Sequence, residues 1–454
     1  MLSTIVAILL HWNKVFAQQR TSQRAIKQAL SSVCVIGRRT IARSYLVQQE
    51  LRDWSSEYKL LSRSPWLPQD LFDPIFKDAI QMCPGKLLPL GTDDTRLRKT
   101  GKKILSAHWG RDPLSPPFHL NLQYGLRFLH TSVLLPLHEN QPVSARALPV
   151  FFQQVAPVKK PGKRATPQQK HAYREAIKQR NLSTEAVGMM KQLRDKADVL
   201  GGQAKTLAFA LDGSFCNRRV FKADLERTIL IARCRKDAKL CWPVRQGRRL
   251  YSKEVFTPDQ VLKDELRPWQ QTTIFHGGKI RKLYYKEVKH VLWRPAGADR
   301  RLRLIVVRPT PYRKSKKGRL LYRQAAYLLT TDLETQARKL VQIYFDRWQV
   351  EVAHKELKDN FGMGQAQVRV AQAVSRQPVL QVATYSAMHL AALKAWGPGR
   401  SDELGPLPKY QRDKSRASCQ ELIRQIRKEV VNKAEELPFE LRISEKSILA
   451  AATI

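Results

Sequence analysis

Short apolar, β-prone runs alternate with helical segments through the middle of this 454-residue chain. Gly, Pro and polar residues separate the runs, which is typical of strands that end in turns. The β-prone runs are residues 87–92, 104–109, 126–137, 206–211 and 228–232. A helical composition at 168–200 lies between the third and fourth runs, and a polar helical segment precedes the fifth. This order predicts an α/β fold, with a mixed sheet covered by helices.

Residues 235–323 interrupt this order, because short β-prone pieces separated by basic turns replace the helices. We interpret them as a β-rich insertion that folds against DNA or against the main sheet. A strand at 327–330 and a helix around Tyr344 then resume the α/β pattern. The predicted parts are an N-terminal helical domain at 1–85, a core divided between 86–234 and 324–395, the insertion at 235–323, and a C-terminal helical segment at 396–454. Its amphipathic helix at 419–434 is a candidate for dimer contacts or for packing on its own domain.

The N-terminal part contains a helix, a glycine turn and a second helix. Residues 21–30 are amphipathic, Gly37 follows, and Thr40 is a suitable N-cap for a helix at 41–51. This pattern is compatible with a helix-turn-helix that recognises DNA. Two packed helices with solvated arginines fit it as well. The cations expected to be exposed here are Arg38, Arg39 and Arg43.

The chain is strongly basic, with 81 Lys+Arg against 39 Asp+Glu and a formal charge of +42. Charge of this sign along the whole chain attracts polyanions, and the expected partner is nucleic acid. None of the six cysteines forms a CxxC pair, which indicates buried thiols in a reducing cytosol. The apolar start at 4–12 lacks a basic leader and is too short to span a bilayer, so we expect a docking helix and no membrane partner.

Three acidic positions are notable for their place in the chain. Asp93, with Asp94 beside it, and Asp212 each follow an apolar strand, and Glu351 lies on a predicted helix. Ligands often bind at the carboxyl edge of an α/β sheet, and carboxylates that meet there suit Mg²⁺ and phosphoryl transfer. Taken singly, an aspartate at a strand end is more often a turn former or a cap, and Glu351 fits a surface ion pair.

Four residues around Glu351 share one face of this helix. The offsets of Tyr344, Arg347, Glu351 and Lys358 are 0, 3, 7 and 14 residues, which fall within an arc of about 60°. A carboxylate between two cations and a phenol suits a site that holds a metal ion and a phosphate together. Upstream, Asp332 is interpreted as the N-cap of this helix, with Glu334 in its first turn.

The same four residues complete the pattern Tyr-x2-Arg-x3-Glu-x6-Lys. This pattern resembles the YREK signature of DDE-class insertion-sequence transposases, in the insertion-sequence-4-like superfamily. The segments around both aspartates also resemble blocks of that family, and the resemblance covers about residues 20–395. The matching segments are Asp93-Asp94-Thr95 with Lys99-Thr-Gly-Lys102, Asp212-Gly-Ser-Phe-Cys-Asn-Arg-Arg, and Asn360-Phe-Gly-Met-Gly with Gln367-Val-Arg369.

The resemblance implies a ribonuclease-H-like sheet in which Asp93, Asp212 and Glu351 bind two Mg²⁺ ions, for which Mn²⁺ can substitute. Asp94 competes with Asp93 for the first position, and the Asp-x-Thr spacing favours Asp93. The implied activity is metal-dependent DNA cleavage and strand transfer at the ends of a mobile element, in the bacterial cytosol at the nucleoid. A homodimer is implied where two DNA ends are paired.

The resemblance also implies DNA contacts. Arg347 and Lys358 are expected to hold phosphates at the transposon end, and Tyr344 to position the same backbone. Trp348 either stacks on a base or lies in the core, and its offset from the stripe favours the core.

Two other classes of protein remain open. One is a basic DNA-binding regulator or a domesticated transposase that no longer cuts. The other is a tyrosine recombinase, for which His108-x-x-Arg111 and tyrosines near arginines are the only support.

Overall fold

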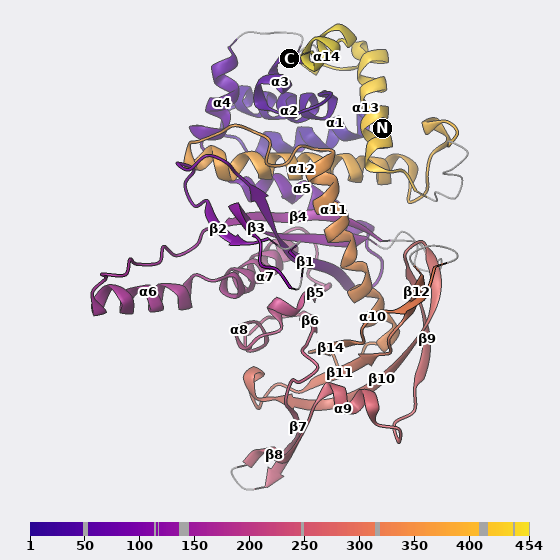
Figure 1. The fold of residues 1–454 in the computed structure, drawn as a ribbon. Helices are drawn as coiled ribbons and strands as arrows, with labels where there is room; N and C mark the ends of the chain where they lie inside the picture. The colour runs from indigo at the N-terminus through magenta and orange to yellow at the C-terminus, as the bar shows by residue number, and fades with distance from the viewer. Residues whose placement is uncertain are drawn as a thin grey trace.

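The computed structural model describes residues 1–48, 53–112, 115–116, 118–135, 145–246, 249–313, 318–407, 416–438 and 441–453. Helices pack around a mixed sheet of twelve strands, and two further strands form a separate ribbon (Figure 1). The predicted α/β class is therefore confirmed for these residues.

The central part of the sheet brings distant segments together. Its strands are β1 (Leu87–Arg98), β3 (Leu122–Leu135), β4 (Arg146–Val155), β5 (Thr206–Leu211) and β6 (Thr228–Arg233). β1 is antiparallel to β3 and parallel to β5, β5 is parallel to β6, and β4 pairs with the far side of β3. β1 therefore lies between the two parallel strands and the antiparallel pair.

The strand boundaries differ from the expected ones at several places. β1 does not end at residue 92 but continues through Asp93 and Asp94 to Arg98, because it pairs with β3 over that whole length. The run at 104–109 forms only the short β2 (His108–Arg111). β4 was not among the strands expected from the sequence. It contains Pro149, which is tolerated there because β4 pairs on one side only among the described strands.

The two faces of the sheet carry different helices. The helical run at 168–200 is divided into α6 (Pro167–Gln179) and α7 (Leu182–Val199), where Asn181 caps the second helix. On β3, Thr131 contacts Met189 of α7, whereas its neighbour His130 contacts His354 of α11 (Trp348–Asp359). Since successive strand residues face opposite sides, α7 and α11 cover opposite faces.

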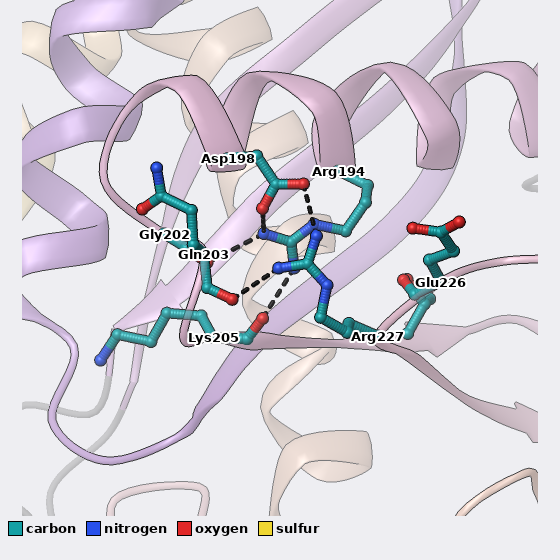
Figure 2. A network of polar contacts seen from close by, with 8 residues as sticks. Arg194, Asp198, Gly202, Gln203, Lys205, Glu226 and Arg227 are labelled. Carbon is teal, nitrogen blue, oxygen red and sulfur yellow. Dashed lines mark hydrogen bonds and ion pairs between the residues drawn. The ribbon is translucent and has the colours of Figure 1, made fainter.

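Polar contacts fix the end of α7 to the sheet. Arg194 donates to Asp198 and to the carbonyls of Gly202 and Lys205, and Arg227 donates to the same Asp198 (Figure 2). Lys205 and Arg227 immediately precede β5 and β6, so this network holds the edge of the sheet where these two parallel strands begin. α6, in contrast, has no buried residue and projects from the body (Figure 1).

Five strands of residues 235–323 continue the main sheet, whereas two others, β12 and β13, pair only with each other among the described residues. From β6 the order runs through β14 (Ala326–Thr330), β11, β10, β7 and β8, and β9 pairs with β10. Of the two alternatives for the insertion, packing on the main sheet is the one observed, by direct strand pairing. The remaining elements are β7 (Leu240–Gln246), β8 (Arg249–Phe256), α9 (Pro258–Lys263), β9 (Gln270–His276), β10 (Lys279–Trp293), β11 (Leu302–Val307), β12 (Pro311–Arg313) and β13 (Leu320–Tyr322).

The predicted helix around Tyr344 forms as α10 (Ala337–Asp346) and α11, with Arg347 between them in helical geometry. α11 lies close to β1 at Gly91, where a Cβ would come within 2.8 Å of the Val350 side chain. Asp332 does not cap α10, whose N-cap is Gln336. Its carboxylate accepts instead from the backbone N–H groups of Glu334 and Thr335, in the turn before the helix.

The N- and C-terminal helices form one layer around the buried α12 (Ala371–Trp396), and Figure 1 shows both ends of the chain on this side. Thr40 caps α3, as predicted, but α3 ends at Leu46, and residues 49–52 lie outside the described residues. α1 packs on α12, which confirms a docking helix, and no described helix is long and apolar enough to cross a membrane. These helices are α1 (Leu2–Leu10), α2 (Gln19–Cys34), α3 (Ile41–Leu46), α4 (Trp54–Ser62), α5 (Asp73–Met82), α13 (Cys419–Asn432) and α14 (Glu445–Ala452).

Candidate functional site

The adjacent residues Asp93 and Asp94 lie on opposite faces of β1. The Asp93 carboxylate accepts from Arg347 Nη1 at 3.0 Å, on the face that α11 covers. The Asp94 carboxylate is held by Arg127 of β3, with Nε at 2.7 Å and Nη2 at 2.9 Å. The strand alternation therefore places only Asp93 beside the helix that carries Glu351.

Arg347 joins Asp93 to Glu351. Its Nη2 donates to Glu351 Oε1 at 3.0 Å, while its guanidinium carbon lies 5.9 Å from the centre of the Tyr344 ring. The Arg347 side chain is only 11% exposed. A nearly buried cation that bridges two carboxylates holds both of them in fixed positions.

Asp212 completes the acidic group from β5. Thr92 of β1 pairs with Leu211 of β5, so Asp93 and Asp212 follow at the same level on neighbouring parallel strands. Such strands are about 4.8 Å apart. The Asp212 side chain makes no capping hydrogen bond to the short 3₁₀ turn that begins at Gly213. Its carboxylate is therefore not used by the local turn.

Burial and, to a smaller extent, neighbouring carboxylates raise the pKa values of the acids in this group. Burial raises the pKa of Asp93 to about 7, against the opposing effect of the Arg347 guanidinium, and the Asp212 carboxylate adds to the rise. Burial also raises the pKa of Glu351, again against Arg347, and Asp212 acts in the same direction as burial. Arg347 thus donates to two of the three carboxylates, and the Asp212 carboxylate acts on it through space. The oxygens of the three carboxylates are a donor set that fits a hard divalent cation.

The other two residues of the predicted stripe lie differently. Tyr344 is half-buried beside Arg347, and burial raises the pKa of its phenol. Lys358 is two helical turns beyond Glu351, about 10 Å along the axis. Burial lowers the pKa of Lys358, and the carboxylates that act on it are Asp112 and Asp359. Lys358 therefore lies beside the acidic group along the helix, not within it.

Trp348 is 52% exposed, so the expectation that its offset from the stripe places it in the core is wrong. It begins α11, next to Arg347, where the helix is not covered on that side.

The N-terminal arginines separate into exposed and buried ones. Arg38 is exposed, as predicted, whereas Arg43 is only half-buried and not fully exposed. Arg39 is only 7% exposed, and its Nε donates to the Ser32 carbonyl. The expectation that Arg39 is exposed is wrong, because this side chain closes the turn between α2 and α3.

A buried histidine pair that was not expected from the sequence lies behind the acidic group. His130 Nδ1 and His354 Nε2 are 2.7 Å apart, and Ser132 Oγ lies 2.8 Å from His130 Nε2. Burial lowers the pKa of His130 to about 3, which keeps the ring neutral. The three-residue spacing from Glu351 to His354 was the only signal for this pair in the sequence.

A second group of metal-ligand residue types lies between α11, α12 and α13. Its members are Glu356, His389 and Cys419, whose ligand atoms lie within 4.8 Å of one another. Arg146 Nη1 is 2.7 Å from His389 Nδ1. Because a guanidinium only donates, Nδ1 must accept, and Nε2 then carries the proton. In that tautomer His389 Nε2 has no lone pair for a metal, so we assign no metal to this group.

A family model described as "Transposase DDE domain" matches residues 226–386. The matched region contains Tyr344, Arg347, Glu351 and Lys358, and it ends within α12. This part of the chain is therefore similar to the DDE domain of transposases. No curated protein matches the chain.

Proposed function

We propose that this protein is a DDE transposase of the YREK type, a metal-dependent DNA endonuclease and strand transferase that acts at the ends of a mobile element. The observation that carries the proposal is the meeting of Asp93, Asp212 and Glu351 around Arg347. These acids come from three separate segments of the chain, and Glu351 lies inside the region that matches the transposase family model.

The proposed catalytic core is ribonuclease-H-like and consists of residues 86–234 and 324–395. One aspartate on β1, a second directly after the parallel β5, and a glutamate on the helix packed over β1 support this assignment. Residues 235–323 form the β-rich insertion. The proposed DNA-binding helical domain is 1–85, and 396–454 is a C-terminal helical segment.

Asp93, Asp212 and Glu351 are the proposed ligands of two Mg²⁺ ions, with Mn²⁺ as a substitute. Bound there, such ions activate a water or hydroxyl and stabilise the leaving oxygen of an in-line phosphoryl displacement. Arg347 keeps Asp93 and Glu351 together by donating to both. Lys358 lies close enough along α11 to hold a phosphate of the strand that is cut.

The proposed partner is DNA, at the element ends and at the target. The +42 charge of the chain supports this choice. Further proposed DNA contacts are Tyr344, the exposed Trp348, Arg38 and Arg43. We also propose a homodimer on paired ends and action in the bacterial cytosol, at the nucleoid.

The first test is the variant Glu351→Gln, which keeps the side-chain size and removes the charge. With DNA flanking the reading frame as substrate, cleavage and strand transfer should fall by at least about 10³-fold in Mg²⁺ or Mn²⁺. DNA binding in a gel-shift assay should stay within twofold of the unmodified protein.

Retained cleavage by the pure Glu351→Gln protein would refute the proposal. Cleavage that survives EDTA and leaves a protein–DNA adduct would indicate tyrosine recombination. Binding without cleavage across several divalent ions and DNA ends would indicate a protein that no longer cuts.

A further inference from the structure

Trp109 of β2 is 66% exposed, although tryptophan is among the most apolar side chains. Its ring lies 5.4 Å from the ring of Tyr124, its cross-strand partner on β3, at an angle of 55°. Such a pair stabilises a hairpin modestly. Most of the indole surface nevertheless remains uncovered, so the fold alone does not account for it.

This aromatic pair lies on the same face of the sheet as the acidic group. Asp93 pairs with His130, and Tyr124 is six residues before His130 on β3, so both point to the α11 face. Trp109, directly opposite Tyr124, shares that face. On the other face, Arg96 donates to the His108 carbonyl at 2.9 Å. Its guanidinium also packs so closely on Gly110 that a Cβ at this position would clash with it. Arg96 therefore fixes the hairpin on one face of the sheet, and Trp109 lies on the opposite face.

The surroundings of the pair are cationic. Lys102, Lys103 and Arg111 are exposed, and the Tyr124 hydroxyl lies 3.4 Å from the Lys102 carbonyl, which places that loop beside the ring. Arg111 pairs with Leu122, two residues from Tyr124 and on the same face. Asp112 is the acid next to Arg111 and acts on Lys358 of α11. An open aromatic surface among cations suits a base with its phosphate backbone.

We propose that Trp109, supported by Tyr124, stacks on an unpaired base of the DNA strand bound at the acidic group. This inference rests on the proposed function for the position of that strand. Six residues of extended β3 separate the levels of Asp93 and Tyr124, about 20 Å, which is about six nucleotide steps of a duplex. Trp109 and Tyr124 therefore contact the DNA strand about six nucleotides from the cleaved phosphate. Where the DNA strand is extended, fewer nucleotides span this distance.

The test uses the full chain carrying Glu351→Gln, so that binding is measured without cleavage. Trp109→Ala is compared with Trp109→Phe, which keeps a ring, and with Trp54→Ala. Trp54 is a matched control, because it is 63% exposed but lies on α4 in the helical layer. The probes are a blunt duplex of the element end and the same duplex with a single-stranded extension that carries 2-aminopurine at successive positions.

We expect Trp109→Ala to weaken binding of the extended probe by about 5- to 100-fold, with blunt-duplex binding changed less than twofold. Trp109→Phe should retain most of the affinity. Trp54→Ala, in the proposed DNA-binding helical domain, should change the affinity for both probes by the same factor. Quenching of 2-aminopurine at one or two positions should disappear in Trp109→Ala alone.

Equal loss of both probes, or unchanged affinity for the extended probe in a folded Trp109→Ala protein, would overturn the inference. A change in the oligomeric state of Trp109→Ala by sedimentation, with unchanged DNA affinity, would also overturn the inference. It would show that Trp109 contacts a second copy of the chain. Cleavage plays no part in this assay. Absence of nuclease activity in the parent protein would therefore refute the proposed function but would not refute base stacking by Trp109.

Discussion

Asp93 and Asp94 illustrate how the geometry of a strand distributes chemistry between neighbouring residues. Their carboxylates point to opposite faces of β1, one to Arg347 and Glu351 and the other to Arg127. The spacing argument from the sequence preferred Asp93, and the contacts support the same choice. Asp94 already forms a structural ion pair with Arg127. The Asp93 and Asp94 side chains are both 19% exposed, so exposure does not distinguish the two acids.

The paired variants Asp93→Asn and Asp94→Asn test this division. Asp93→Asn should reduce single-turnover cleavage by at least about 10³-fold, because it removes a proposed metal ligand. Asp94→Asn should keep cleavage within about tenfold of the unmodified protein and lower the free energy of unfolding by about 1–2 kcal/mol through the lost Arg127 pair. The reverse order of the two cleavage rates would identify Asp94 as the ligand.

At the scale of elements, the N-terminal helices pack around a buried acid. Glu57 of α4 accepts from Gln28 of α2 at 3.2 Å, and Arg24 Nε lies 3.5 Å from its other oxygen. Burial raises the pKa of Glu57 to about 7, although Arg24 opposes the rise. The helix pair that suggested a helix-turn-helix thus has an internal polar contact to α4 as well as the buried Arg39.

This acid makes the stability of the protein depend on pH. Between about pH 4.5 and 7, the folded protein keeps a proton on Glu57 that the unfolded chain has released. Its contribution to the free energy of unfolding therefore falls as pH rises through that window. Glu57→Gln should be more stable than the unmodified protein by about 1–3 kcal/mol at pH 8 and equally stable near pH 4.5, by urea unfolding.

The exposed Glu435→Gln is the control, with no expected pH-dependent difference. A Glu57→Gln protein that is less stable at pH 8 would show that the ionised carboxylate stabilises the helices.

At the scale of the whole molecule, one continuous sheet connects the acidic group to the basic strands of residues 235–323. The insertion adds strands to the edge of the core beyond β14, so its cations are fixed relative to Asp212 and Glu351. Several stay exposed on β10, including Lys279, Arg281 and Lys282. Cations spread over such a length suit the proposed DNA partner, whose phosphates repeat along the duplex.

DNA binding should therefore depend steeply on salt. For about 6–10 phosphate contacts, the affinity of the Glu351→Gln protein for an element-end duplex should fall by about 10³- to 10⁵-fold between 50 and 200 mM salt. Arg38→Ala should reduce the slope of log affinity against log salt by about one if the N-terminal helices contact DNA. An unchanged slope would remove Arg38 from the DNA interface.

The sequence by itself determined the α/β class and most of the strands and helices, and it singled out the three acids that we propose as metal ligands. Hydrophobic periodicity and the Tyr344–Lys358 spacing depend on nearby residues, so they can be read without the fold. Only the tertiary structure decided which acid of the Asp93-Asp94 pair faces Glu351, and that β1 continues past both. It also decided that Arg39 is buried, that Trp348 is exposed and that His130 contacts His354. These outcomes depend on strand register and on packing between segments distant in the chain, which local patterns do not encode.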